Sequence, residues 1–323
     1  MTSIRMVALA ACALVTACGA AAAQAWPSRP VTVMVPFPAG GTADLLARGI
    51  VQALSDELHQ PFVVENRPGA SGNLAAAAVA KAPPDGNSLL FASQAQAAFN
   101  KLMFATLPYD PQRDLVPIML VMKAPVAFVA GKDAPVQSLR EMVDQAKANP
   151  GKLTIGQVGV GSMSHIAYEL LQQIGGITLN GVPYKGGAPM VTDLLGGHLP
   201  LASDLLSNFI PLAKEKKVRV LAVATAQRIN DLPDVPTVLE SIQAPVEAAA
   251  WFVLMARAGT PADIVQKVNA IANRYLHSAQ AKGLIERQAL LVGGGTPADA
   301  AAFVKLELDK WAPVIKTANI SLD

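Results

Sequence analysis

Residues suited to binding a charged ligand gather in a glycine-rich loop near the start of the chain, residues 36–44, PFPAGGTAD. Its two prolines stop the apolar run before it, and Gly40 and Gly41 let backbone N–H groups come close to a ligand. Thr42 or Asp44 is expected to cap the helix that follows. The unpaired N–H groups and the dipole of such a helix start attract an anion without any Lys or Arg. The loop therefore predicts a site for a negatively charged group.

A second loop of the same kind, residues 159–165, GVGSMSH, leads from another apolar run into a helix through Ser162 or Ser164. Each loop taken alone fits an ordinary turn between a strand and a helix equally well. Two such loops, one in each half of the molecule, can face each other across a cleft, so the pair favours a binding site. The dinucleotide fingerprint fails, because Ser164 stands where its third glycine belongs, and no Walker loop occurs.

A hydrolase that uses Ser162, His165 and Asp204 is the alternative from another functional class. A Ser and a His three residues apart in one helical turn serve helix capping better than nucleophilic catalysis, and no G-x-S-x-G motif occurs. We therefore expect His165 to be a polar residue of the cleft, and we expect no catalysis. The four histidines are scattered without metal-ligand spacing, so no metal site is predicted.

Two further charged residues each allow a ligand contact or a structural role. Lys185, in the sequence YKGG, can attract an anion or remain a solvated loop lysine. Asp204, in LASDLLSN, can orient an ammonium, a hydroxyl or a water molecule, or it can cap the following helix. The residue types leave these alternatives open.

Strands and helices must alternate along the chain to position these loops. Apolar runs bounded by turn residues predict strands at 31–35, 62–65, 88–92, 126–130, 154–157 and 218–224. Helical patterns separate these runs almost throughout, so we expect an α/β protein with mainly parallel sheets.

Several helix boundaries can also be predicted. The first helix has an apolar face that recurs every four residues, at Leu46, Ile50, Leu54 and Leu58. Ser138 and Glu141 have the spacing of a capping box. Thr260 and Thr296 each precede a proline, which predicts a cap residue followed by proline at the first helical position.

The first residues, 1–25, have the pattern of a signal peptide, with Arg5 before an apolar stretch and Ala23-Gln24-Ala25 as a cleavage site. The mature chain would then begin at Trp26. An alternative is a lipobox, because VTAC resembles one, and Cys18 would then be a lipidated first residue. Both cysteines lie in this leader, so the mature chain has no disulfide or thiol chemistry. No later stretch is long enough to span a membrane, so we expect a soluble protein in the periplasm.

Charge and length narrow the function classes further. The chain has 26 Lys and Arg against 24 Asp and Glu, with no large block of like charge, so a nucleic acid partner is not expected. Its 323 residues exceed what one core comfortably holds, so two lobes are expected. Strand-rich stretches at 117–130 and 249–256 predict that the chain crosses twice between the two lobes. Lobe 1 would combine 26–124 with 247–323, and lobe 2 would be 125–246.

The order of short motifs along the mature chain resembles that of the tripartite tricarboxylate transporter substrate-binding receptors, the Bug or TctC-like family of extracytoplasmic solute receptors. The resemblance covers nearly the whole mature chain. It rests on WPSRPVTVMVPFPAGGTAD (26–44), VVENRPGASGN (63–73), APPDG (82–86), LPYDP (107–111), GVGSMSH (159–165), VPYKGGAP (182–189), TDLLGG (192–197), LPDVPT (232–237) and WFVLMARAGTP (251–261). So many motifs in this order are specific.

The resemblance implies a two-lobed periplasmic-binding-protein fold of the type II, Venus flytrap kind. It implies a small carboxylate as the ligand and membrane permease subunits as partners, with no catalysis and no cofactor, and we expect a monomer. Receptors of this family hold the ligand carboxylate between two loops, partly through ordered water. The matching positions are Phe37, Ala39, Gly41, Thr42 and Asp44 in the first loop and Gly161, Ser162 and His165 in the second, with Ser93, Gln94 and Asp204 as weaker additions.

Three stretches depart from the commonest family wording, namely Gln94-Ala95-Gln96, residues 201–204 and Ala249-Ala250. They lie where the variable end of a ligand would lie. The sequence therefore leaves open whether the ligand is a di- or tricarboxylate, an amino acid or an aromatic acid. A receptor that reports ligand occupancy to a signalling partner is a second alternative.

Overall fold

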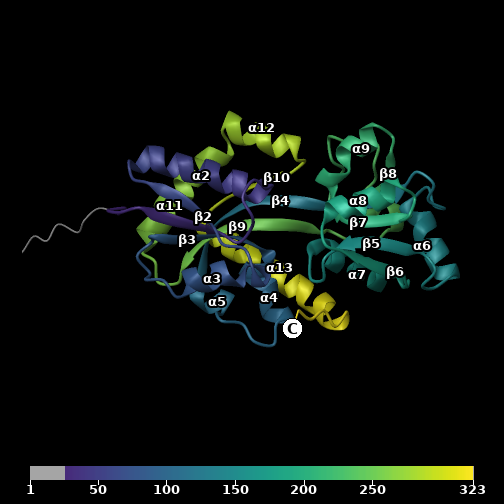
Figure 1. Cartoon of the computed structure of the whole chain (residues 1–323), viewed down its shortest axis with the longest axis horizontal. Helices are drawn as coiled ribbons and strands as arrows, with labels where there is room; N and C mark the ends of the chain where they lie inside the picture. The colour runs from purple at the N-terminus through teal and green to yellow at the C-terminus, as the bar shows by residue number, and fades with distance from the viewer. Residues whose placement is uncertain (1–25, 323) are drawn as a thin grey trace, which may run out of the picture.

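The computed structural model describes residues 26–322 and shows two lobes side by side, joined by two long strands (Figure 1). Lobe 1, on the left of Figure 1, contains the first and last parts of the chain, and lobe 2 is formed by its central part. The predicted signal peptide and Cys18 lie outside the described residues. Within residues 26–322, no helix combines the length and the apolar character needed to cross a membrane.

The sheet of lobe 1 has a parallel core. Strand β1 (Val31–Val35) lies between β2 (Phe62–Asn66) and β3 (Ser88–Ser93) and pairs in parallel with both. Its alternate valines are fully buried, as expected for a strand covered on both faces. A short fourth strand, β10 (Leu291–Gly294), pairs antiparallel with the crossing strand β4.

Lobe 2 repeats this arrangement. Strand β5 (Thr154–Val158) pairs in parallel with β6 (Asn180–Tyr184) and β7 (Leu201–Leu205). Strand β8 (Val218–Val223) pairs antiparallel with β4. Each lobe thus presents the carboxyl ends of its parallel strands at one edge.

The crossing strands β4 (Leu115–Gly131) and β9 (Ala249–Arg257) run antiparallel through both lobes and join their sheets into one. β4 contains Pro117 and Pro125, and its register against β9 shifts next to Pro117, where a ladder N–H is missing. The predicted α/β, two-lobed fold class is confirmed. The sheet is mixed, because the crossing strands add antiparallel pairs to the parallel core of each lobe.

Helices cover the sheets of both lobes. Those of lobe 1 are α2 (Thr42–Leu58), α3 (Asn73–Ala80), α4 (Asn100–Met103), α5 (Pro111–Asp114), α11 (Ala262–Leu276), α12 (Ala279–Arg287) and α13 (Pro297–Thr317). Those of lobe 2 are α6 (Leu139–Ala148), α7 (Met163–Gly175), α8 (Gly187–Leu195), α9 (Ile210–Lys214) and α10 (Val238–Ile242). Three short helical turns complete the list, η2 (Ala70–Gly72), η3 (Ala95–Phe99) and η4 (Leu206–Asn208).

The predicted apolar face of α2 packs as expected, with its first three leucine and isoleucine side chains fully buried and the last, Leu58, partly buried. Thr296 caps α13 in a complete capping box with Asp299, as its spacing predicts. Ser138 caps α6 as predicted and accepts from the N–H of Glu141 at 3.2 Å, but the Glu141 carboxylate accepts from the N–H of Gln137 instead of Ser138, so the capping box is incomplete. The predicted cap Thr260 is wrong by one residue, because α11 begins after Pro261.

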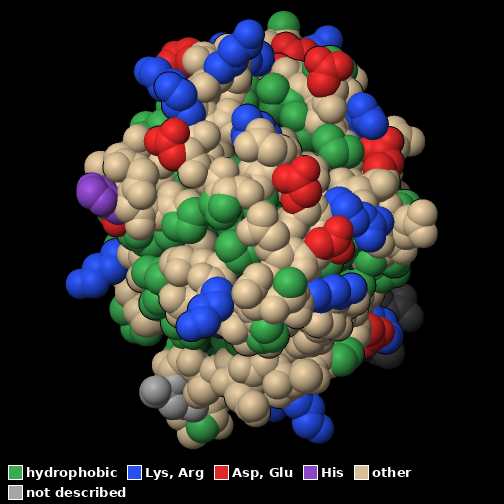
Figure 2. Space-filling view, turned by 90° about the vertical axis from the view of Figure 1, so that its right-hand side faces the viewer, with side chains coloured by type: hydrophobic (Ala, Val, Ile, Leu, Met, Phe, Trp, Pro, Cys, Tyr) green, Lys and Arg blue, Asp and Glu red, His purple; other side chains and the backbone are tan. Residues whose placement is uncertain are grey.

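The outer face of lobe 2 carries charges of both signs. Figure 2 shows its Lys and Arg side chains interspersed with Asp and Glu side chains, without a continuous field of one sign. A surface of this kind has no electrostatic footprint for a polyanion.

Candidate functional site

Strand topology brings the two glycine-rich loops toward the crossing strands. β3 ends at Ser93, which pairs with Phe252 of β9, and β7 ends at Leu205, which pairs with Val126 of β4. Phe252 itself pairs with Met122 of β4, only four residues before Val126. The carboxyl ends of the parallel strands in both lobes therefore meet at the same crossing. Ligands of open α/β sheets bind beyond such strand ends.

The loop of residues 36–41 forms an open start for α2. The N-cap is Gly41, which provides no side chain, so the predicted caps Thr42 and Asp44 do not occupy that position. Gly40 has φ +89°, which only glycine adopts without strain. A Cβ on Gly40 or Gly41 would meet no atom within 4 Å, and Ala39 is exposed. The first N–H groups of α2 are thus left for an external acceptor.

Asp44 holds this loop in place from inside. Its carboxylate is 1% exposed and accepts hydrogen bonds from the N–H of Gly40 at 2.9 Å, from Arg48 Nε at 2.8 Å and from Asn66 Nδ2 at 2.8 Å. Asn66 also donates to the carbonyl of Phe37 at 3.0 Å. Burial alone would raise the pKa of Asp44, but these hydrogen bonds outweigh it and hold the pKa below its usual value. Asp44 is therefore a positioning residue, with no oxygen left over to receive a ligand.

Sequence reasoning missed Arg48 and Asn66, which complete this arrangement. The spacing of Asp44 and Arg48, four residues apart on a helix, is a readable signal for an ion pair. Asn66 has a weaker sequence signal: it is the polar residue that ends β2, and it pairs with Val35, the last residue of β1.

The side chains of Thr42 and Phe37 are both engaged within lobe 1. Thr42 Oγ1 donates a hydrogen bond of 2.7 Å to Gln288, just beyond α12. Phe37 packs edge-on against Phe252 of β9, with ring centroids 5.6 Å apart. The loop thereby contacts the crossing strand, and any ligand contact at Thr42 falls most readily on its backbone N–H.

The second loop, residues 159–162, is shaped by helix capping. Ser162 is the N-cap of α7, accepts from the N–H of His165 at 3.2 Å and donates to the carbonyl of Val158. The N–H of Gly161 donates to His165 Nδ1 at 3.1 Å. Gly161 has φ +76°, and a Cβ there would lie 2.8 Å from Met103 Sδ in α4. The loop therefore lies directly against lobe 1.

Ser162 and His165 are not arranged as a catalytic nucleophile and its general base. Ser162 meets the backbone of His165, whereas the ring nitrogen Nδ1 accepts from Gly161, and Nε2 lies 3.6 Å from Glu169. In a serine hydrolase, a ring nitrogen of the histidine accepts a hydrogen bond from the serine hydroxyl. Among residues 26–322, no three His, Cys, Asp or Glu side chains are close enough to hold a metal ion.

One segment connects the two loops. Pro36 approaches Gly72, where a Cβ would lie 2.9 Å from the proline Cβ, and Gly72 is in turn packed against Gln96 of η3. Met103, which touches Gly161, follows seven residues later in α4. The two loops therefore flank the same helical segment.

Ser93 and Gln94, the weaker candidates, belong to this segment and are largely used by the protein. Ser93 Oγ donates to Gln96 Oε1 at 2.9 Å, and the side-chain Oε1 of Gln94 accepts from the backbone N–H of Trp251 at 3.1 Å. Gln96 also donates to the carbonyl of Ser71 at 2.7 Å. These hydrogen bonds hold residues 93–96 in place between the two loops.

Asp204 lies buried at the end of β7, 4% exposed, beside the start of α8. Asn208 Nδ2 donates to its carboxylate at 2.7 Å, and a Cβ on Gly187 would lie 2.9 Å from Asp204 Oδ2. Burial raises the pKa of Asp204 to about 6, although hydrogen bonds from the Leu205 N–H and Asn208 oppose it. Asp204 does not cap η4, which has no side-chain cap. Lys185 is exposed on the same edge.

The fold and the two loops at the crossing define a two-lobed ligand-binding protein. The model of the tripartite tricarboxylate transporter family receptor matches residues 46–320, and the chain belongs to this family. The predicted family is therefore confirmed. Protein BugT of Bordetella pertussis is 34% identical over 307 residues, which cover 93% of this chain and 92% of BugT.

Solved structures agree with this assignment. The R. palustris protein Rpa4515, solved with adipate, is 38% identical and aligns with a TM-score of 0.79 over 92% of this chain and 99% of its own. MatC from Rhodopseudomonas palustris, solved with bound malate, is 33% identical and has a TM-score of 0.75 over 90% of this chain and 100% of its own.

Proposed function

We propose that this chain is an extracytoplasmic receptor that binds a small carboxylate between residues 36–44 and 159–165 and delivers it to a tripartite transporter. The observation that carries the proposal is the uncapped start of α2 at Gly41, at the crossing of two lobes and across one helical segment from the start of α7. The adipate and malate bound to two relatives support a carboxylate as the ligand class.

Backbone donors supply the attraction in this proposal. The N–H groups that begin α2 would bind one carboxylate, with Gly41 leaving room for close approach, and the loop of Gly161 and Ser162 would bind from lobe 2. Hydrogen bonds to a charged group contribute about 1.5–3 kcal/mol each, so a few of them reach the roughly 8 kcal/mol of micromolar binding after ordering costs. His165 and Asp204 would face the variable part of the ligand.

Closure of the two lobes completes the mechanism. A ligand that contacts both loops binds the closed arrangement better than the open one and shifts the equilibrium toward it. The lobes would be 26–124 with 247–323, and 125–246; the passage of β4 and β9 between them, seen within residues 26–322, supports this division.

A thermal-shift screen tests the ligand class. We would compare adipate, malate, citrate, glutamate and benzoate, each against a neutral matched compound such as adipamide. A ligand at about 100 times its Kd adds about 2.7 kcal/mol to the unfolding free energy, which raises Tm by several degrees. Stabilisation by at least one carboxylate and by no amide is expected. If no carboxylate raises Tm, the proposal is wrong.

The location and partners are proposed on the same basis. The mature receptor would begin at Trp26, work in the periplasm as a monomer and meet the membrane permease subunits of the transporter. The intact mass of the exported protein distinguishes this start from a lipidated Cys18.

A further inference from the structure

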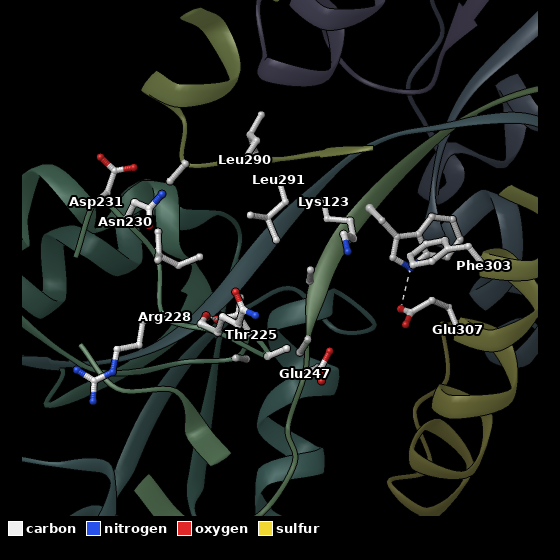
Figure 3. A pocket seen from close by; sticks show the side chains of 18 of the residues that line it. Lys123, Thr225, Arg228, Asn230, Asp231, Glu247, Leu290, Leu291, Phe303 and Glu307 are labelled. Carbon is white, nitrogen blue, oxygen red and sulfur yellow. Dashed lines mark hydrogen bonds between the residues drawn. The ribbon is translucent and has the colours of Figure 1, made fainter. Parts of the chain in front are cut away.

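A cavity of about 900 Å³ lies where lobe 2, the crossing strands and the last helices of lobe 1 meet (Figure 3). Its lobe 2 wall is the stretch 224–231 that follows β8. Its lobe 1 wall combines the residues around Leu290 with one side of α13, and Lys123 and Trp251 come from the crossing strands. None of the residues proposed above for carboxylate binding lines it.

This cavity lies on the other side of β9 from the loop 36–44. Successive side chains of a strand point to opposite faces of the sheet. Phe252 points toward Phe37 of that loop, whereas Trp251 points toward α13, with its ring 5.4 Å from Phe303 and its indole nitrogen 3.0 Å from Glu307. The cavity is thus separate from the proposed carboxylate site.

Lys123 is the distinctive residue of the cavity. Its ammonium lies 5.9 Å from the ring centroid of Phe303, and within residues 26–322 it forms no ion pair with a carboxylate. The other two basic residues of the lining are engaged, since Arg228 pairs with Glu240 at 3.0 Å and Lys310 donates to the carbonyl of Glu247 at 2.6 Å.

The acidic residues of the lining do not neutralise Lys123. Glu307 is buried and accepts hydrogen bonds from two indoles, those of Trp251 and Trp311, at 3.0 Å each. Asp231, Glu247 and Glu286 are exposed to water. In Figure 3, Lys123 lies between Leu291 and Phe303, while Asp231 lies at the upper left and Glu247 below Lys123.

We propose that this cavity is a second ligand site, for an organic anion with an apolar body. The anionic group, a carboxylate or a sulfonate, would pair with Lys123, and the apolar body would cover the partly exposed Leu291 and Phe303. The volume lies in the range of small-molecule sites, which combine apolar walls with a few placed polar groups. An unpaired ammonium above aromatic and aliphatic side chains supplies that combination.

The test uses 8-anilinonaphthalene-1-sulfonate, an aromatic sulfonate whose emission rises in apolar surroundings, titrated into the mature protein. We expect saturable binding of one molecule. Lys123→Met should weaken it about tenfold or more, since a hydrogen bond to a charged group is lost. Lys123→Arg should bind within about threefold of wild type. Lys152→Met, at an exposed lysine of a lobe 2 turn, is the matched control and should leave binding unchanged.

A second pair of variants locates the dye without touching the core. Leu306 lines the cavity and is 62% exposed, so Leu306→Glu should fold normally and repel the sulfonate. Leu74→Glu, at a 54% exposed leucine of α3, is its control. Because the dye also binds partly unfolded chains, each variant must keep the wild-type Tm. The proposal is overturned if wild type does not bind, or if Lys123→Met and Leu306→Glu both bind like wild type. No carboxylate is present in this assay, so its outcome is independent of the thermal-shift screen.

Discussion

Thr42 Oγ1 donates a hydrogen bond of 2.7 Å to Oε1 of Gln288, across 246 positions of sequence. It connects the first turn of α2, where we propose that the carboxylate binds, to the stretch between α12 and β10. Leu290 and Leu291, just beyond Gln288, line the cavity that contains Lys123. The two proposed sites therefore share a structural element within lobe 1.

The Thr42–Gln288 contact should be measurable as a coupling energy. Thr42→Val and Gln288→Leu should each lower the unfolding free energy by about 1 kcal/mol, and the double variant should lose less than the sum, by about 1 kcal/mol. Urea denaturation gives all three values. Thr192→Val, which removes a bond within α8, should add to Gln288→Leu without coupling. Full additivity of Thr42→Val and Gln288→Leu would show that the bond contributes nothing.

Thr42→Val also separates a side-chain role from a backbone role in binding. Valine keeps the N–H, so the affinity for a carboxylate found in the screen should stay within about threefold of wild type, less than the loss of one hydrogen bond to a charged group. A much larger loss, measured by calorimetry, would show that the hydroxyl itself contacts the ligand.

Replacing Asp44 should loosen the loop that it anchors. Asp44→Asn removes the charge that Arg48, Asn66 and Gly40 share, and should cost about 2 kcal/mol of unfolding free energy at pH 7 and weaken carboxylate binding. Because the folded pKa is lowered, this stabilisation is present above the unfolded value of about 4 and is lost as the pH falls through the folded value. Urea denaturation at pH 7 and pH 3 checks this. The exposed Asp56→Asn, whose carboxylate accepts from Gln52, should change little at either pH.

Asp204 should make the pH dependence of stability opposite to that caused by Asp44. Burial raises the folded pKa of Asp204 to about 6, above its ordinary value of about 4, so the folded state binds the proton more tightly and loses stability as the pH rises through this interval. A difference of about two units corresponds to roughly 3 kcal/mol, as an order of magnitude. Asp204→Asn should therefore gain stability relative to wild type between pH 4 and pH 7, followed by thermal unfolding at each pH. If the Tm of wild type and of Asp204→Asn changed equally with pH, burial would not raise the pKa of Asp204.

Two glycine substitutions should differ sharply. Gly161→Ala forces φ +76° on alanine and places its Cβ against Met103, so it should cost about 1–2 kcal/mol from the backbone alone. Gly41→Ala has open space and an ordinary φ of −76°, so Tm should not change. Its methyl group stands at the helix start, however, so carboxylate affinity should fall. Equal stability of the two variants would refute the assignment of strain to Gly161.

Local patterns predicted the parts of the fold that local residues determine. The strand–loop–helix units at 31–58 and 154–175 follow from alternating valines, helix-breaking glycines and the spacing of Leu46, Ile50 and Leu54. β7 was missed, because LASDL places the charged Asp204 inside a buried strand. Its burial depends on Asn208 and on α8, which the sequence pattern does not reveal.

The contacts of the candidate site were less accessible from sequence. Asp44 was expected to cap α2, and it holds Gly40 and Asn66 instead, because parallel pairing of β1 with β2 places Asn66 beside it. Gln288 and Lys123 give no local signal, since one lies beyond a surface helix and the other in an apolar run. Only the fold brings them to the two sites.

The pairing of Pro125 with Ala249 has a consequence for how this architecture can diversify. The chain leaves lobe 1 and returns to it on adjacent strands, so the two ends of the central segment are neighbours in space. A segment with such ends can be excised and replaced by another of equal span without moving the rest of the molecule. In chimeras joined at these two positions, lobe 2 of one receptor should therefore be replaceable by lobe 2 of another.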